Sequence, residues 1–119
     1  MVMNEFRFPG LRPLLVLCAL LPPGCASLPR ANVQDLARTR TQFPGATLAS
    51  LEAGRRAFAD SCAGCHALPR PEAKSAEEWP KVLDEMALEA KLSSGQRDLI
   101  AQFLTAISRR SQSAQLERR

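Results

Sequence analysis

The order of apolar and polar residues along the chain predicts helices. Three stretches repeat apolar residues at the three- and four-residue spacing of an amphipathic helix, and no stretch alternates with the period of two that marks a half-buried strand. We expect helices at about 48–60 and 79–90, and a third that runs from a cap at Ser93 to near Arg109. A short helix at 33–40 is left open. The pattern, which contains no internal repeats, therefore predicts an all-α protein.

Each predicted helix has one apolar stripe. The stripes comprise Leu48, Leu51 and Phe58 in the first helix, Trp79, Val82, Leu83, Met86 and Ala90 in the second, and Leu99, Ile100, Phe103, Leu104 and Ile107 in the third. Pro80 suits the first turn of the second helix, where its missing N–H removes no hydrogen bond. Ser93 followed by Gln96 predicts a capping box at the start of the third.

The first 26 residues have the pattern of an export signal. The side chains of the first 13 residues are net positive, because Arg7 and Arg12 outnumber Glu5. An apolar run at 14–21 follows, which is too short to span a bilayer. Pro22 and the next proline end that run. A charged start, a short apolar run and small residues at 24–26 indicate a secretory signal over 1–26. The alternative is a short buried helix, which the two prolines would stop early.

Two cleavage sites fit this signal. Cys25 after the small Gly24 resembles the lipid-modified cysteine of bacterial lipoproteins, although Pro22 occupies the position where that pattern has Leu. Release after Ala26 also fits the rule of small residues on either side of one variable position. We expect an exported, periplasmic protein that is held at the membrane by a lipid on Cys25, with release after Ala26 as the alternative.

The remainder divides into a tether, a domain and a tail. Residues 27–47 contain few large apolar side chains, no sustained period and a break at Pro44 and Gly45, which is typical of a flexible tether. The domain is expected at 48–108 and a basic C-terminal tail at 109–119. A core of this size is marginal and often needs a disulfide, a metal or a large cofactor.

Charge is unevenly distributed along the chain. Its 119 residues are 45% hydrophobic and 24% charged, which rules out a disordered polyelectrolyte, and their net charge is +4. Within 48–108, however, seven basic residues stand against nine acidic ones. The tail has four arginines and no interleaved aromatic residue, so it is not a nucleic-acid surface. The tail is either a solvated helix end or a segment that weakly attracts anionic lipid or an acidic partner.

The segment after the first predicted helix carries the chemistry of the chain. It reads Cys62-Ala-Gly-Cys65-His66, the C-x-x-C-H attachment signature of a c-type haem. Two thiols at this spacing on a helical turn reach the two vinyl groups of one porphyrin, and the next imidazole lies beneath the iron. A zinc site needs four ligands, a thioredoxin-like pair belongs near a βαβ unit, and a disulfide with a bystander His is the third alternative. We expect one covalently bound haem c.

These features resemble the class I, single-haem cytochromes c of bacteria over about residues 51–104. The resemblance covers Gly54-x-x-x-Phe58, the run 62–69, Trp79 with Met86, and Phe103-Leu104. It implies a domain of about three helices wrapped around the haem, whose first and last helices cross with Gly54, Phe58 and Phe103 at the crossing. The Gly-Pro pair usual in that family is not present, so the stretch Pro69–Pro71 is our candidate for the carbonyl that orients His66.

The resemblance also implies a methionine as the sixth iron ligand. Met86 is the only Met beyond the predicted signal, and His66 is the only His of the chain, which excludes sites built on several histidines. The alternative is that Met86 fills the apolar stripe of its helix. Lysine amines at 74, 81 and 91 are weaker ligands because they are protonated at neutral pH. Trp79 is expected to contact the macrocycle, bond a haem propionate or fill the core. Arg55 and Arg56 are expected either to pair with a propionate or to be solvated.

The sequence thus predicts an electron carrier and not an enzyme. The cofactor-binding residues are Cys62, Cys65, His66 and Met86, with His66 and Met86 on the iron. The expected partners are a redox protein donor and acceptor that meet the domain transiently, with no small-molecule substrate and no nucleic acid. The alternative is a haem-based module that binds or senses a diatomic gas at an open or weakly held sixth site. A constitutive subunit of a periplasmic dehydrogenase is a third possibility.

Overall fold

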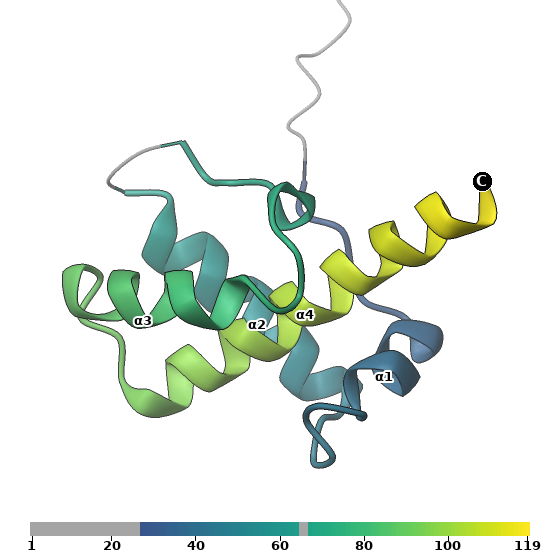
Figure 1. Ribbon diagram of the computed structural model, residues 1–119. Helices are drawn as coiled ribbons and strands as arrows, with labels where there is room; N and C mark the ends of the chain where they lie inside the picture. The colour runs from purple at the N-terminus through teal and green to yellow at the C-terminus, as the bar shows by residue number, and fades with distance from the viewer. Residues whose placement is uncertain (1–26, 65–66) are drawn as a thin grey trace, which may run out of the picture.

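The computed structural model describes residues 27–64 and 67–119, and every regular element within them is helical (Figure 1). The elements are α1 (Val33–Thr39), α2 (Leu48–Cys62), a 3₁₀ turn η1 (Pro71–Ala73), α3 (Trp79–Glu89) and α4 (Ser94–Glu117). The all-α prediction is confirmed. The three predicted helices begin where the apolar pattern placed them, and the short helix left open at 33–40 is present as α1.

Side-chain caps explain where three of the helices begin. Capping boxes join Asn32 to Asp35 at α1, Thr47 to Ser50 at α2 and Ser93 to Gln96 at α4. In each box the side chain of the cap residue accepts a backbone N–H that the helix leaves unbonded. The box predicted at Ser93 is therefore confirmed. Helix α3 has no side-chain cap and carries Pro80 in its first turn instead.

Helices α2 and α4 cross closely at Gly54. A Cβ atom placed on this buried glycine would lie 2.0 Å from the carbonyl oxygen of Leu99 and 3.0 Å from Cβ of Phe103. Phe58, one turn further along α2, stacks against Phe103 with ring centroids 6.2 Å apart. The crossing of the two helices at these residues agrees with the expectation from the resemblance.

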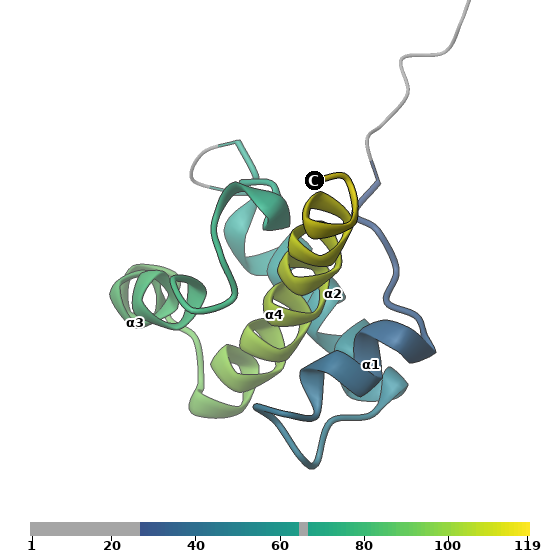
Figure 2. The ribbon, with the colours of Figure 1, turned by 45° about the vertical axis from the view of Figure 1, so that its right-hand side comes forward.

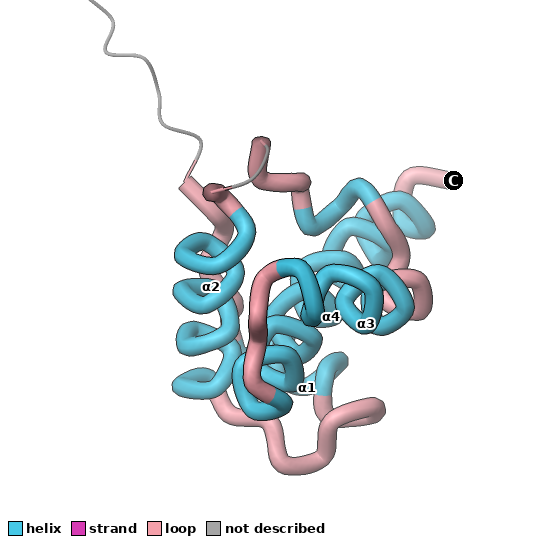
Figure 3. Tube along the Cα trace, turned by 90° about the vertical axis from the view of Figure 1, so that its left-hand side faces the viewer, coloured by secondary structure: helices cyan, strands magenta, loops and turns pink. Residues whose placement is uncertain are grey.

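The core lies between α2, α3 and α4. Its buried members are Phe58, Trp79, Leu83, Ile100, Ala101, Phe103, Leu104 and Ile107. All of them except Ala101 come from the three apolar stripes of the sequence, since a stripe at helical spacing faces one side. The loop 67–78 passes from the end of α2 along α4 to the start of α3 (Figure 3). Because η1 packs on α4, this loop is attached to the core.

Residues 27–47 fold onto the domain, which corrects the prediction of a flexible tether. Helix α1 packs against α4. The carboxylate of Asp35, which is fully buried, pairs with Arg110 of α4 and with Arg38 of its own helix. The apolar side chains of Leu28, Ala31 and Phe43 also pack against the core, but they are too few and too irregularly spaced for the apolar pattern to predict this packing.

The expected basic tail at 109–119 is also corrected. Helix α4 was expected to end near Arg109, but it continues to Glu117. Arg109 donates to the carbonyl oxygen of Arg38 at 3.0 Å, and the Arg110 guanidinium holds Asp35. The folded unit therefore includes both segments that flank 48–108. Figures 1 and 2 show α1 and α3 on opposite sides of the long helix α4.

The predicted signal at 1–26, with the candidate lipid site Cys25, lies outside the described residues. Among the helices that are described, none is both long and apolar enough to cross a membrane. The structure therefore describes the folded unit only, and export and lipid attachment stay predictions.

Candidate functional site

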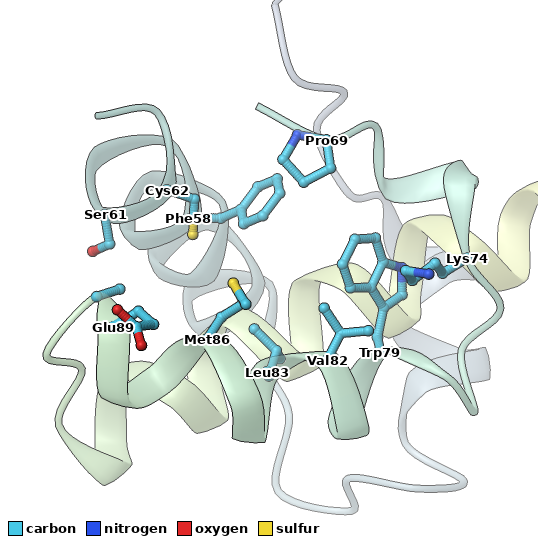
Figure 4. Close-up of a pocket in the computed structure, with 11 residues that line it drawn as sticks. Phe58, Ser61, Cys62, Pro69, Lys74, Trp79, Val82, Leu83, Met86 and Glu89 are labelled. Atoms are coloured by element: carbon cyan, nitrogen blue, oxygen red, sulfur yellow. The ribbon is translucent and has the colours of Figure 1, made fainter. Parts of the chain in front are cut away.

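A cavity of about 350 Å³ opens between the C-terminal end of α2, helix α3 and the loop that joins them (Figure 4). Its volume falls in the range of small-molecule and cofactor sites, roughly 300–1,000 Å³. The lining residues are Phe58, Ser61 and Cys62 of α2, Pro69 and Lys74 of the loop, Trp79, Val82, Leu83, Met86 and Glu89 of α3, and Ala90. Most of this wall is aliphatic or aromatic.

Two of the four predicted cofactor residues line this cavity. Cys62 is the last residue of α2 and Met86 lies in the middle of α3. In Figure 4 their sulfur atoms point into the space between the two helices from opposite sides. Cys65 and His66, the other two predicted residues, lie outside the described part of the chain. The structure thus brings the start of the C-x-x-C-H run and the expected sixth ligand to one cavity.

Met86 does not fill the core of the described fold. Its side chain is 38% exposed, whereas Trp79 and Leu83 on the same stripe are each 2% exposed. A methionine that only packed the interior would be buried like those neighbours. The exposure of Met86 therefore counts against the alternative of core filling, and its role as a ligand stays a prediction.

Trp79 forms one wall of the cavity and is held in place by hydrogen bonds. Its Nε1–H donates to the carbonyl oxygen of Pro71 at 2.8 Å and to Oγ of Ser108 at 3.0 Å. Its ring meets Phe58 edge-on at 6.4 Å. Because the indole N–H already has two buried acceptors, the core role expected for Trp79 is favoured over a hydrogen bond to a propionate.

The hydrogen bonds of the loop narrow the search for the carbonyl that orients His66. The oxygen of Pro71 accepts from Trp79 Nε1 and also from Oγ of Ser108 at 2.7 Å. The oxygen of Arg70 accepts from the backbone N–H of Ala73 at 2.9 Å. A carbonyl has two lone pairs, so Pro71 has none left for an imidazole. Arg70 keeps one lone pair, so Arg70 and Pro69, which lines the cavity, remain the candidates from this stretch.

Arg55, for which a propionate partner and solvation were the two alternatives, is paired within α2 instead. Arg55 donates from Nε and Nη2 to the carboxylate of Glu52, both at 2.8 Å. These hydrogen bonds hold the pKa of Glu52 at about 2. Arg56 also donates to Glu52, at 3.3 Å. Both arginines are thus engaged on their own helix, and the charged residues that do line the cavity are Lys74 and Glu89.

Ser108 attaches the loop beside the cavity to α4, and the sequence analysis did not predict this role. It follows Ile107 and lies one turn after Leu104, on the buried face of α4. A hydroxyl on an apolar stripe needs a buried partner, which was the available signal. Its hydrogen bond to Pro71 ties the loop beside the cavity to α4.

Comparisons with known proteins leave the function to be argued from this geometry. No family model matches the chain, and no curated protein or solved structure matches it either. In 27–64 and 67–119 no three His, Cys, Asp or Glu side chains lie close enough together to hold a metal ion. The features that indicate a site are therefore the cavity and the C-x-x-C-H run.

Proposed function

We propose that the chain is an electron carrier that holds one covalent haem c in the cavity between α2 and α3. Cys62 and Cys65 form the thioethers, His66 is the proximal ligand and Met86 the distal one. The observation that carries the proposal is that Cys62 and Met86 line the same apolar cavity from opposite helices. The spacing of the C-x-x-C-H run supplies the rest of the argument.

The residues present fit a porphyrin. The rings of Phe58 and Trp79 and the side chains of Val82 and Leu83 provide an apolar wall for a flat macrocycle. At Gly64, inside the C-x-x-C-H run, a Cβ atom would meet nothing within 4 Å, so a large group can approach this backbone. Apolar burial of a large cofactor also suits a core of this size.

The protein residues set the conditions for electron transfer. A bound haem supplies a one-electron Fe(III)/Fe(II) couple. The thioether of Met86 is a soft ligand that favours the reduced iron, and the apolar wall penalises the additional positive charge of the oxidised iron. Both effects raise the midpoint potential. The partial exposure of Met86 leaves this side of the cavity within reach of a partner protein.

The cellular setting belongs to the same proposal. The chain is exported and held at the membrane by a lipid on Cys25, and it exchanges electrons with a redox protein donor and acceptor through transient contacts. No small-molecule substrate is involved. Co-purification with a partner separates a constitutive subunit from a free carrier.

The decisive experiment replaces Met86 and reads the iron directly. The full chain is expressed in a host that matures c-type cytochromes, as wild type, Met86→Leu and Leu88→Ala. Met86→Leu keeps the apolar volume but removes the sulfur, and Leu88, 84% exposed on the same helix, does not line the cavity. We expect wild type and Leu88→Ala to show the weak far-red sulfur-to-iron band. Met86→Leu should lose this band, bind carbon monoxide when reduced and have a lower midpoint potential.

Two results would contradict the proposal in different ways. Colourless wild-type protein, in which both Cys62 and Cys65 react with an alkylating agent, would show that the chain carries no covalent haem. Coloured wild-type protein that binds carbon monoxide as readily as Met86→Leu would instead favour the gas-binding alternative, in which the sixth site is open.

A further inference from the structure

The positive charge of the chain gathers in the two segments that flank 48–108. Residues 27–47 and 109–119 together carry seven arginines against Asp35 and Glu117, whereas 48–108 has a balance of −2. Asp35 is fully buried in its pairs with Arg38 and Arg110. Glu117 is therefore the only side-chain carboxylate of these two segments that faces water.

The fold joins these segments into one surface, which we call the basic face: the arginines of 27–47 and of 109–119. Arg110 donates to the carbonyl oxygen of Arg30 at 2.7 Å, and Arg109 donates to the carbonyl oxygen of Arg38 at 3.0 Å. These bonds connect residues that are 80 and 71 positions apart. Figures 1 and 2 place α1 and the C-terminal part of α4 on the side of the molecule opposite α3.

A recess of about 330 Å³ opens on the basic face between α1 and α4. Five of its lining side chains are hydrogen-bond donors: Arg38, Thr41, Arg109, Gln112 and Ser113. Glu77 is its one acidic residue, and Leu116, 72% exposed, adds an apolar contact. Nε of Arg38 is buried and has no hydrogen-bond partner among the described residues. The hydroxyls of Thr41 and Ser113 already donate to backbone carbonyls. Arg109 bonds only neutral oxygens, so its charge, together with the amide of Gln112, is what suits the phosphate of a lipid headgroup.

The distance along the chain from Cys25 favours a membrane as the occupant. The structure replaces the expected tether with a helix that packs on α4, so the basic face begins at Arg30. Arg30 lies five positions after Cys25, and such a segment spans at most about 18 Å. A lipid on Cys25 would thus hold the basic face close to a bilayer, and bilayers with anionic lipids attract basic residues within about a Debye length.

We propose that the basic face docks on anionic phospholipid bilayers, with headgroup phosphates at the recess between α1 and α4. Docking in this way turns α3 and the cavity of Cys62 and Met86 away from the membrane, toward soluble partners. Docking itself needs neither the haem nor the lipid on Cys25, because the charges and the recess belong to the folded protein; Cys25 enters only in the choice of a membrane as the occupant.

Vesicle binding of the non-acylated chain tests this proposal. The full chain carries Cys25→Ser and is sedimented with phosphatidylcholine vesicles, either pure or with about 30% phosphatidylglycerol. One variant removes three exposed charges of the basic face by Arg30→Gln, Arg118→Gln and Arg119→Gln. The matched control removes three charges elsewhere by Arg70→Gln, Lys81→Gln and Lys91→Asn. Asn suits position 91 because the backbone φ there is 52°.

We expect binding only to the phosphatidylglycerol vesicles, with affinity lost as salt rises toward about 1 M. The basic-face variant should bind at least roughly tenfold more weakly, while the control stays within about twofold. Equal weakening of binding in both variants, or no preference for phosphatidylglycerol, would overturn the proposal. Thermal melts that match the wild type show that the variants are folded. Colour and sedimentation are read on one sample, so colourless protein that still binds vesicles contradicts only the proposed function.

Discussion

Gly54 sets how closely α2 and α4 approach each other. A Cβ atom at this position would lie 2.0 Å from the carbonyl oxygen of Leu99, and that oxygen belongs to helix backbone that cannot rotate away. Gly54→Ala should therefore lower the free energy of unfolding by at least about 2 kcal/mol, because the helices must separate. Denaturant unfolding followed by circular dichroism measures the change.

Gly95 supplies the control for this substitution. It also lies in a helix, in the first turn of α4, but a Cβ atom there would meet nothing within 4 Å. Gly95→Ala should be neutral or stabilising by up to about 1 kcal/mol, since alanine loses less backbone entropy in a helix. Equal effects at both glycines would mean that the close approach at Gly54 does not limit the packing.

Ser108 fixes the loop and the indole that border the cavity. Its hydroxyl donates to the carbonyl oxygen of Pro71 and accepts from Trp79. Ser108→Ala removes both bonds but leaves Trp79 bonded to Pro71, so we expect a loss of about 1–2 kcal/mol in unfolding free energy. Ser111→Ala is the control on the same helix, and it should change stability by less than about 0.5 kcal/mol. If Ser108→Ala lowers the unfolding free energy by no more than the control does, Ser108 does not anchor the loop.

The sequence predicted which residues belong to the candidate site more fully than it predicted the hydrogen bonds of the residues around them. Cys62 was predicted by its motif, and Met86 by the resemblance together with its being the only Met beyond the predicted signal. The structure places both at one cavity. The roles of Cys65 and His66 stay predictions. The hydrogen bonds of Trp79 and the Glu52 partner of Arg55 could not be predicted, because each depends on which rotamer and neighbour the fold selects.

At the scale of elements, helix α1 depends on one buried carboxylate. Burial alone would raise the pKa of Asp35, but the hydrogen bonds from Arg110 and from the backbone N–H of Asn32 outweigh it and lower the pKa below its usual value. Arg110 of α4 and Arg38 of α1 are the cations that pair with Asp35. A carboxylate with a lowered pKa stabilises the fold above its unfolded pKa of about 4, and this contribution is lost as pH falls through the folded value.

Thermal melts between neutral and acidic pH test this role of Asp35. We expect wild-type stability to fall below about pH 4, and Asp35→Asn to show a shallower dependence after a loss of about 2 kcal/mol at neutral pH. Some dependence should remain, because Glu52 also has a lowered pKa, of about 2. Asp60→Asn, at an exposed position of α2, should retain the wild-type profile. An unchanged profile in Asp35→Asn would show that the pairing with Arg110 does not hold α1.

Apolar periodicity located α2, α3 and α4 but missed how α1 is attached. The stripes of the three longer helices bury large side chains, and burial of apolar area is what the pattern reports. Helix α1 instead docks through Asp35 and through the backbone carbonyls that Arg109 and Arg110 bond. Polar contacts of this kind leave no periodic signal, so the segment was interpreted as a tether.

At the scale of the whole molecule, the core divides into a closed part and a part that borders the cavity. Ile100, Phe103 and Leu104 are fully buried between the helices without any ligand. Helix α3, by contrast, borders the cavity along its whole apolar stripe. Its lining residues include Trp79, Val82, Leu83 and Met86, of which only Trp79 and Leu83 are buried. The proposed cofactor should therefore stabilise α3 more than it stabilises the α2–α4 pair.

Hydrogen exchange tests this division. In a Cys62→Ala/Cys65→Ala protein, which cannot form thioethers, amides of α3 should exchange at least roughly tenfold faster than in the haem-bearing wild type. Amides at the crossing of α2 and α4 should change much less. Uniform loss of protection in all helices would mean that the cofactor is required for the whole fold, and no change at α3 would argue against a ligand in the cavity.

The sequence by itself determined the helical class and the positions of three helices, and it predicts the C-x-x-C-H chemistry, because periodicity, caps and motifs are local properties of the chain. Only the tertiary structure decided that Cys62 meets Met86 at one cavity, that Ser108 holds Pro71, and that both flanks join the folded unit. Each of these depends on contacts between residues far apart in sequence. Such contacts arise from the packing of whole helices, which a local pattern does not encode.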